Sequence, residues 1–402
     1  IRYLDKVTIS GSSPTPDTTV YSYQTVEEGV GEDPDIVTLS RYLISSVSVD
    51  GKSEGADDLI DEVGQTFKEI LSFTKYDGKR LQKMLYTWNM DSEISYDVYG
   101  KYTDNVQDSV VYFYEGSFLD VSWTLDGQKT ALNEGDELLS MTKYDGTREQ
   151  KMLYSWNFDS SAFYDATEAK AHENKVADST IYDYRVNIGT ENEFVSRYLH
   201  GSTNIYGKVT NDTVSQTQEE VISFTKYDGE RTQNMLYTWN MTGGVLWNAI
   251  SQYDDASSKS LNETGVSDST VYKYSGRYLD ESYSLDGKKT EATVNDDILS
   301  LTKYIVGRDQ KMLYTWNMAD DVKWDEFSAY LDSDVLDSTT YEYEGRYLLT
   351  SWNLDGKKTA LAGGDSLLSM TKYDATRDQK MLYTWNFESS TVYDDTEAKD
   401  RK

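Results

Sequence analysis

The sequence of 402 residues contains no cysteine, three prolines and two histidines. Without cysteine the chain has no disulfide, no thiolate nucleophile and no cysteine-ligated metal. Two histidines, His172 and His200, offer little for imidazole catalysis or zinc chemistry. The prolines Pro14, Pro16 and Pro34 all lie near the N-terminus, so nearly every other backbone N–H group is available for pairing in a sheet.

Positive charge and long apolar runs are also scarce. Lys and Arg total 39 against 70 Asp and Glu, which gives a net charge of −31. A phosphate backbone requires the opposite sign, so nucleic acid is excluded as a general partner. Apolar runs such as Val110–Tyr114 are only a few residues long, and we therefore expect no membrane span. Aromatic residues make up 13% of the chain, which is enough to build a folded core despite the charge.

Two alternating motifs fill the sequence. The first reads FTKYDGKRLQKMLYTWN from Phe73, and its siblings begin at Met141, Phe224, Leu301 and Met370. The second reads DSTVYKYSGRYLDESYSLDGKKT from Asp268, with compact siblings from Asp108 and Asp337 and with inserted copies from Asp17 and Asp178. We interpret both as versions of one element of about 35 residues, paired into units of about 70.

The motif pairs predict the organisation of the chain. A partial repeat at 1–16 precedes five pairs at 17–107, 108–177, 178–267, 268–336 and 337–402. Insertions in the first and third pairs lengthen the stretch equivalent to Tyr274–Arg277, as expected at a hairpin tip, where extra residues cost little entropy. Because Arg2–Asp5 matches Arg277–Asp280, we expect a window of a longer array or a protomer whose tail meets the next copy; simple truncation is the alternative.

Strict alternation with a period of two predicts β-strands in both motifs. A helix would scatter the Met-x-Tyr-x-Trp row of the first motif around its cylinder. We therefore expect these rows to form one apolar face and the structural core of the fold. The rows are Met84, Tyr86, Trp88, Met152, Tyr154, Trp156, Met235, Tyr237, Trp239, Met312, Tyr314, Trp316, Met381, Tyr383 and Trp385.

Asp-Gly pairs end the apolar strand of the second motif. This dipeptide is typical of two-residue hairpin turns in which both central residues adopt positive φ. We predict such turns at Asp126 and Gly127, at Asp286 and Gly287, and at Asp355 and Gly356.

These patterns predict an all-β fold of tandem antiparallel hairpins stacked as an open solenoid, spiral or wrapped sheet. A single hairpin has one apolar face that it cannot bury alone, so each repeat must be stabilised by its neighbours. A closed β-propeller is the alternative, since five pairs of about 70 residues can form blades.

The stretch VYKYSGRYLDESYSLDGKKT, Val271–Thr290, resembles the YD repeats of bacterial Rhs-type and teneurin-type surface proteins. The Tyr-Asp-x-x-Gly spacing of that family is shortened here, and the QKMLYTWN strand is not part of its pattern. The resemblance implies a large secreted or surface β structure that wraps in a spiral. It assigns no catalytic residue.

Two features are candidates for chemistry. Gly51–Gly55 matches Gly-x-Ser-x-Gly, but it follows an Asp-Gly turn rather than a strand that leads into a helix, so we interpret it as a chance match. The acidic segments Asp320–Asp321, Asp332–Asp334 and Asp394–Asp395 offer oxygen ligands for Ca²⁺ without an EF-hand spacing, and a solvated acidic surface is the simpler interpretation. We expect no catalytic residue and no cofactor other than Ca²⁺.

The leading functional hypothesis is a non-enzymatic structural protein at the cell surface or outside the cell, forming or decorating a fibre, filament or sheath through β-strand stacking. Its expected partners are copies of itself, head to tail, or the rest of a longer repeat chain. The alternatives are an adhesin or glycan-binding array and a wall section of a toxin-enclosing YD shell. Glycan contacts would use Tyr42, Tyr278 and Tyr347 or the variable segments Gln24–Ser40, Val186–Ser196 and Thr242–Val266.

Overall fold

The computed structural model describes residues 7–9, 18–27, 36–49, 70–90, 105–165, 175–186, 194–213, 219–247, 265–307, 310–325, 329–344, 347–374, 380–388 and 391–393. They fall into two compact units. The first comprises residues 1–181 with 207–211, and the second comprises residues 182–206 with 212–402.

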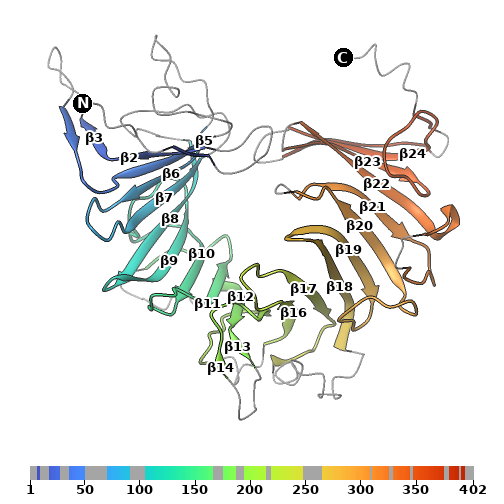
Figure 1. Cartoon of the computed structure of the whole chain (residues 1–402), viewed down its shortest axis with the longest axis horizontal. Coiled ribbons are helices and arrows are strands. Elements are labelled where there is room, and N and C mark those ends of the chain that lie inside the picture. Colours follow the sequence, from blue (N-terminus) through green and yellow to red (C-terminus); the bar gives the residue numbers. More distant parts are fainter. Residues whose placement is uncertain are drawn as a thin grey trace, which may run out of the picture. The chain divides into compact units, whose positions relative to one another are not determined.

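The first unit is an antiparallel meander in which each strand of the sheet pairs with the next. Several of its strands lie side by side in Figure 1. The strands are β1 (Val7–Ile9), β2 (Thr18–Ser22), β5 (Ser45–Val49), β6 (Ile70–Tyr76), β7 (Met84–Met90), β8 (Val106–Glu115), β9 (Phe118–Asp126), β10 (Leu138–Tyr144), β11 (Met152–Phe158) and β12 (Val176–Asp183), whose last two residues belong to the second unit.

The second unit continues the same pattern, again with every strand of the sheet paired to its successor. A short 3₁₀ turn, η5 (Asp332–Asp334), precedes β22. The strands are β15 (Gly201–Tyr206), β16 (Val221–Tyr227), β17 (Met235–Met241), β18 (Val266–Ser275), β19 (Tyr278–Asp286), β20 (Ile298–Tyr304), β21 (Met312–Met318), β22 (Val335–Glu344), β23 (Tyr347–Asp355), β24 (Leu367–Tyr373) and β25 (Met381–Asn386).

Strand pairing crosses the boundaries between motif pairs. The last strand of one pair is hydrogen-bonded to the first strand of the next at β7–β8, β11–β12, β17–β18 and β21–β22. In a propeller each blade is a separate four-stranded sheet, so strands of successive blades are not hydrogen-bonded to each other in this way. The all-β array of antiparallel hairpins is therefore confirmed, and the propeller alternative is wrong.

The tips of the second-motif hairpins are tight. Glu115 pairs with Phe118 across a two-residue loop whose first residue, Gly116, has φ 58°. Positive φ at the first central position is typical of a type II′ turn, which suits the twist of the flanking strands. In the two inserted copies a further hairpin grows from this tip, as the position of the insertions predicts. These hairpins are β3 (Gln24–Glu27) with β4 (Ile36–Leu39), and β13 (Arg185–Val186) with β14 (Phe194–Val195).

The Asp-Gly pairs do not form the two-residue turns that the sequence predicts. Asp126 is the last residue of β9 and pairs with Asp108, and only Gly127 has positive φ, at 66°. The Gly127 N–H extends the ladder by donating to the Gln107 carbonyl at 3.0 Å. The chain then forms a longer loop, residues 128–137, before β10 begins at Leu138 and pairs antiparallel with β9. Asp286 and Gly287, and Asp355 and Gly356, repeat this arrangement.

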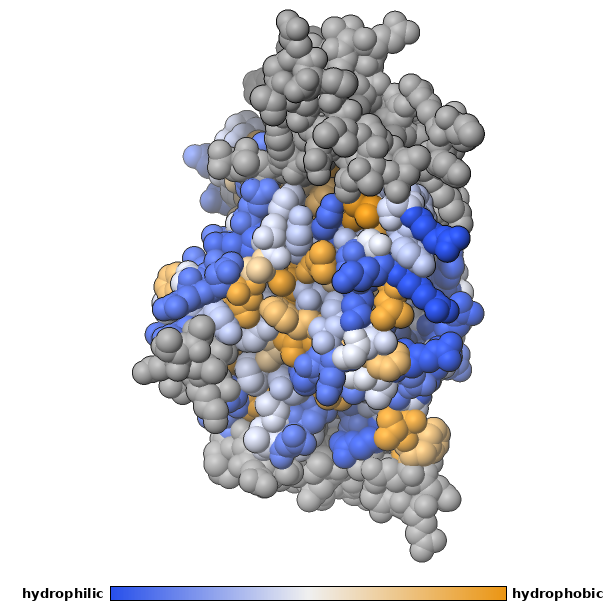
Figure 2. Space-filling view, turned by 90° about the vertical axis from the view of Figure 1, so that its left-hand side faces the viewer, coloured by the Kyte–Doolittle hydropathy of each residue, from blue (hydrophilic) through white to orange (hydrophobic). Residues whose placement is uncertain are grey.

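The core lies on one face of the sheet, beneath the connections that follow β9 and β11. Leu138 N donates to the Ala162 carbonyl at 2.8 Å, and an isolated bridge joins Glu137 to Phe163, so the two connections pair with each other over that face. One cluster beneath them contains Val111, Leu125, Leu138 and Ala162. On the side shown in Figure 2, apolar side chains appear in small groups among hydrophilic ones. A single sheet is thus buried by its own connections rather than by a second sheet.

Candidate functional site: the junction between successive motifs

In every described first motif except the last, the tryptophan is covered by the second motif that follows it. Its Nε1 donates to a backbone carbonyl in the loop beyond that motif's second strand. The tryptophan side chains are only 1–6% exposed. The pairs are Trp88 with Lys129 at 2.7 Å, Trp156 with Val209 at 2.8 Å, Trp239 with Lys289 at 2.6 Å and Trp316 with Lys358 at 2.7 Å.

A buried serine at the start of the second motif holds this loop in place. Ser269 Oγ donates to the Gly287 carbonyl at 2.6 Å and accepts from the Lys289 N–H at 2.7 Å. Because the residue is 0% exposed, no water can replace either bond. The same pair of bonds is made by Ser109, Ser179 and Ser338.

The two lysines of the Asp-Gly-Lys-Lys loop have separate partners. Lys288 Nζ lies 4.7 Å from the centroid of the Trp239 ring, a cation–π contact. Lys289 forms an ion pair with Asp296, which is 6% exposed. Burial opposes the charge on Asp296, but hydrogen bonds from Lys289 and Thr293 outweigh it, so the pKa of this carboxyl lies below its usual value. Lys357 over Trp316 and Lys358 with Asp365 repeat the arrangement.

The opposite face of the junction is closed by polar pairs. Asn240 Nδ2 donates to Asp268 Oδ1 at 2.6 Å across β17 and β18. Thr238 Oγ1 lies 2.9 Å from Thr225 Oγ1 and 3.3 Å from the Tyr272 hydroxyl, so three strands are linked side chain to side chain. Asn89, Asn157 and Asn317 make the same bond to the following Asp. Each junction is therefore sealed on both faces of the sheet.

A glutamine before the first motif's strand fixes the neighbouring hairpin. Gln233 has a left-handed φ of 51°, and its Oε1 accepts from the Leu199 N–H at 3.2 Å. Gln82, Gln150 and Gln310 have the same conformation and bond. The strand pattern alone predicts no role for this glutamine. Its presence in all five copies of the first motif was the available signal.

The predicted core rows are not equally buried. In four copies the Trp is buried and stacks with a half-buried Tyr at 4.8–5.3 Å, while Met84, Met152, Met235 and Met312 are half-buried. In the fifth copy Met381, Tyr383 and Trp385 are 71%, 43% and 53% exposed. The expectation that these three residues belong to the core is wrong for the described part of the chain, because no second motif there covers them.

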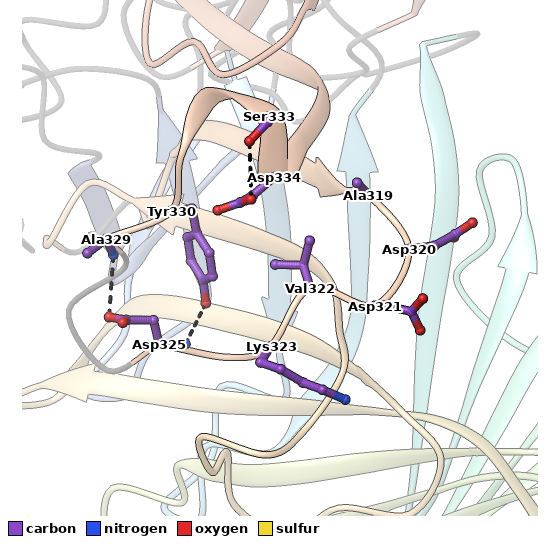
Figure 3. Close-up of a pocket in the computed structure, with 10 residues that line it drawn as sticks. All are labelled: Ala319, Asp320, Asp321, Val322, Lys323, Asp325, Ala329, Tyr330, Ser333 and Asp334. Carbon is purple, nitrogen blue, oxygen red and sulfur yellow. Dashed lines mark hydrogen bonds between the residues drawn. The ribbon is translucent and has the colours of Figure 1, made fainter.

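Two of the three acidic segments proposed for Ca²⁺, Asp320–Asp321 and Asp332–Asp334, contribute to one surface pocket (Figure 3), lined by residues 319–323, 325, 329, 330, 333 and 334. The backbone N–H of Asp325 donates to the Tyr330 hydroxyl at 2.9 Å, and Asp334 accepts from the Leu331 N–H at 2.7 Å. The carboxylates of Asp320 and Asp321 point away from Asp334. Among the described residues no three Asp, Glu or His side chains are grouped as a metal site requires.

The remaining residues singled out in the sequence are either outside the described residues or not exposed. Gly51–Gly55, His172 and Asp394–Asp395 lie outside the described residues. The tyrosines offered for glycan contact, Tyr42, Tyr278 and Tyr347, are half-buried rather than exposed. No helix within the described ranges is long and apolar enough to cross a membrane.

Comparison with known proteins finds matches among solved structures but no family model and no curated relative. Among solved structures, a Tc holotoxin pore from Photorhabdus luminescens aligns with 89% of this chain at 12% identity and a TM-score of 0.18. A porin-like protein from Bacteroides uniformis aligns with 69% of this chain and 91% of its own at 9% identity and a TM-score of 0.16. The chain spans 16% of the toxin chain's length.

Proposed function

We propose that the chain is a non-enzymatic structural protein, a β-repeat element of a fibre, filament or sheath outside the cell or on its surface. The observation that carries this proposal is the repeated junction, in which strand pairing, a buried serine and a covered tryptophan join one motif pair to the next. The side chains that recur in every closed copy are used for packing and cross-strand bonding. They contribute to rigidity rather than to a reaction centre.

The physical consequence is an array in which each repeat is stabilised by its neighbours. In such arrays stability is roughly a sum of repeat terms and nearest-neighbour interface terms. The interface here combines a buried Trp, two bonds to a buried Ser and an ion pair with a buried Asp. A net charge of −31 then opposes side-by-side aggregation of assembled material.

Electron microscopy of the purified full chain tests the proposal. We expect elongated or sheet-like particles built from several copies. Raising the salt about tenfold should increase their bundling while leaving the fold intact, because salt screens repulsion between exposed charges. A population of isolated monomers at every salt concentration would contradict assembly.

Adhesion is the second candidate, favoured by the hairpin β13–β14. Its residues Phe194 and Val195 are 56% and 64% exposed, which is unusual for apolar side chains at a hairpin tip. A screen against immobilised glycans tests this candidate. Binding that disappears when the segment Val186–Ser196 is shortened supports adhesion, and binding that persists refutes this hairpin as the contact.

A further inference from the structure

The outer edge of β25 carries an apolar row that no described residue covers. Trp385 is 53% exposed, against 1–6% for the four tryptophans at the same motif position. Within the described ranges β25 pairs with β24 alone, and Trp385 Nε1 has no hydrogen-bond partner. This strand is therefore an open copy of the junction that is closed elsewhere.

The aromatic part of this junction is already formed. The rings of Tyr383 and Trp385 lie 5.0 Å apart at an interplanar angle of 28°. In the closed copy, Tyr237 and Trp239 lie 4.9 Å apart at 29°. The open site therefore holds its rings in the docked geometry without the docked partner. Preorganisation of this kind lowers the entropy cost of binding.

The polar part is present as well. Thr384 is bonded to Thr371 at 3.0 Å, as the equivalent threonine of β17 is bonded to its own neighbour at 2.9 Å. In the closed copy that threonine also meets the Tyr272 hydroxyl at 3.3 Å, and the following asparagine donates to Asp268 at 2.6 Å. On β25 the corresponding residues are Thr384 and Asn386. Within the described residues neither has the tyrosine hydroxyl or aspartate carboxylate that its equivalent contacts in the closed copy.

We infer that β25 is a docking edge for a β-hairpin of the second motif. The partner is defined by its chemistry. Its strand begins with Asp-Ser, which pairs with Asn386 and Trp385. Its Gly-Lys-Lys loop then provides a backbone carbonyl that accepts from the indole N–H and a lysine ammonium that lies over the indole ring. This inference rests on the proposed structural function and names the partner that function requires.

Pairing of two β25 strands with each other fits the edge less well. Two such strands present tryptophan and asparagine to one another, with no lysine for the indole ring and no aspartate for Asn386. The incoming loop of a second motif also brings a lysine, which in a closed copy lies over the indole ring, as Lys288 does over Trp239 at 4.7 Å. This local cation–π contact favours the second-motif hairpin.

A peptide of residues 268–290 is the probe, because it holds the complete second motif and contains no tryptophan. Titrated into the full chain, it should change the fluorescence of Trp385 saturably, and Trp385→Phe should abolish that change. A peptide with Asp268→Ala and Ser269→Ala should bind at least about tenfold more weakly, since it loses the aspartate that accepts from the asparagine and the two serine bonds that hold its own loop in place.

The matched control in the chain is Leu382→Ala. The equivalent leucines in three of the four closed copies, Leu85, Leu236 and Leu313, remain 38–41% exposed, and Leu153 in the fourth is half-buried, so the docked hairpin leaves this position largely uncovered. We expect the Leu382→Ala variant to bind the peptide within about twofold of the parent chain. Loss of binding in this variant, or undiminished binding of the peptide by Trp385→Ala when binding is followed by calorimetry, would overturn the proposed contact.

The register is tested by disulfide trapping, which is straightforward because the chain has no cysteine. Asn386→Cys in the chain should cross-link to a peptide with Asp268→Cys and much more slowly to one with Tyr272→Cys. Equal rates refute the register. Preferential cross-linking of Asn386→Cys chains to each other assigns the edge to a second β25 and also refutes it.

The outcome is separable from that of the proposed function. Filaments without peptide binding would overturn the docking edge and leave the structural role standing. Peptide binding by a chain that never assembles would support the docking edge and contradict assembly.

Discussion

Substitution of the buried serine Ser269 tests how tightly a second motif is held to the preceding strand. Ser269→Ala removes the donor to the Gly287 carbonyl and the acceptor for the Lys289 N–H, bonds of 2.6 and 2.7 Å at a residue that is 0% exposed. Leaving a buried polar group unsatisfied costs about 1–3 kcal/mol each, so two groups with partial relaxation should cost about 2–4 kcal/mol locally.

The assay is native-state hydrogen exchange at the Lys289 amide, because a chain of several repeats need not unfold in one step. A loss of about 3 kcal/mol corresponds to exchange faster by roughly 10²-fold. The control is Ser267→Ala, two residues earlier, where the side chain is exposed and bonds Asn240 and Asp268 at the surface. It should change exchange by no more than about 0.5 kcal/mol. Equal effects of the two substitutions would refute the role of Ser269.

Three further perturbations act on other parts of the fold. Trp316→Ala should destabilise the chain by about 3–5 kcal/mol in urea unfolding, whereas Trp385→Ala, at an open site, should cost less than about 1 kcal/mol. Gly229→Ala should cost more than Gly276→Ala: both glycines have φ near 65°, but a Cβ at 229 would lie 2.0 Å from a histidine ring carbon and one at 276 meets nothing. Burial is the main cause that raises the pKa of Tyr274 to about 12, because it disfavours the ionised phenolate. The stability that this tyrosine contributes should therefore be lost as pH rises from about 10 to 12, and urea midpoints measured across this range follow the loss.

Each of these has a clear contrary result. Similar losses for Trp316→Ala and Trp385→Ala would mean that the following motif does not bury the tryptophan. Equal stability of the two glycine variants would place the histidine ring elsewhere. A urea midpoint that does not respond to pH between about 10 and 12, or responds equally in Tyr274→Phe, would remove the tyrosine from the alkaline transition.

The strands were predictable from the sequence because their residues alternate with a period of two and recur in five copies. Met152, Tyr154 and Trp156 alternate in the sequence, and the latter two stack in the structure. The path of the chain after Asp126 was not predictable, because an Asp-Gly pair ends a strand in the same way whether the chain turns back at once or through a longer loop. Dipeptide chemistry is local, whereas this choice depends on packing against the core.

The junction itself was only half predictable. The aromatic rows showed which side chains must be buried. Their partners are backbone carbonyls 41–53 residues further along, and every residue has a carbonyl, so the sequence does not indicate which one is used. The roles of Ser269 and Lys289 became visible only once the loop lay over Trp239. The exposure of Trp385 could not be read from its motif, which is the same as in the buried copies.

The exchange rates of the tryptophan indole N–H groups test most directly whether each motif is covered by the next. In a spectrum of the full chain that resolves its 9 tryptophans, Trp88, Trp156, Trp239 and Trp316 should exchange slowly, because each is hydrogen-bonded and 1–6% exposed. Trp385 should exchange fast and become protected when the 268–290 peptide is added. Rapid exchange at all five of these positions would contradict the covered junction.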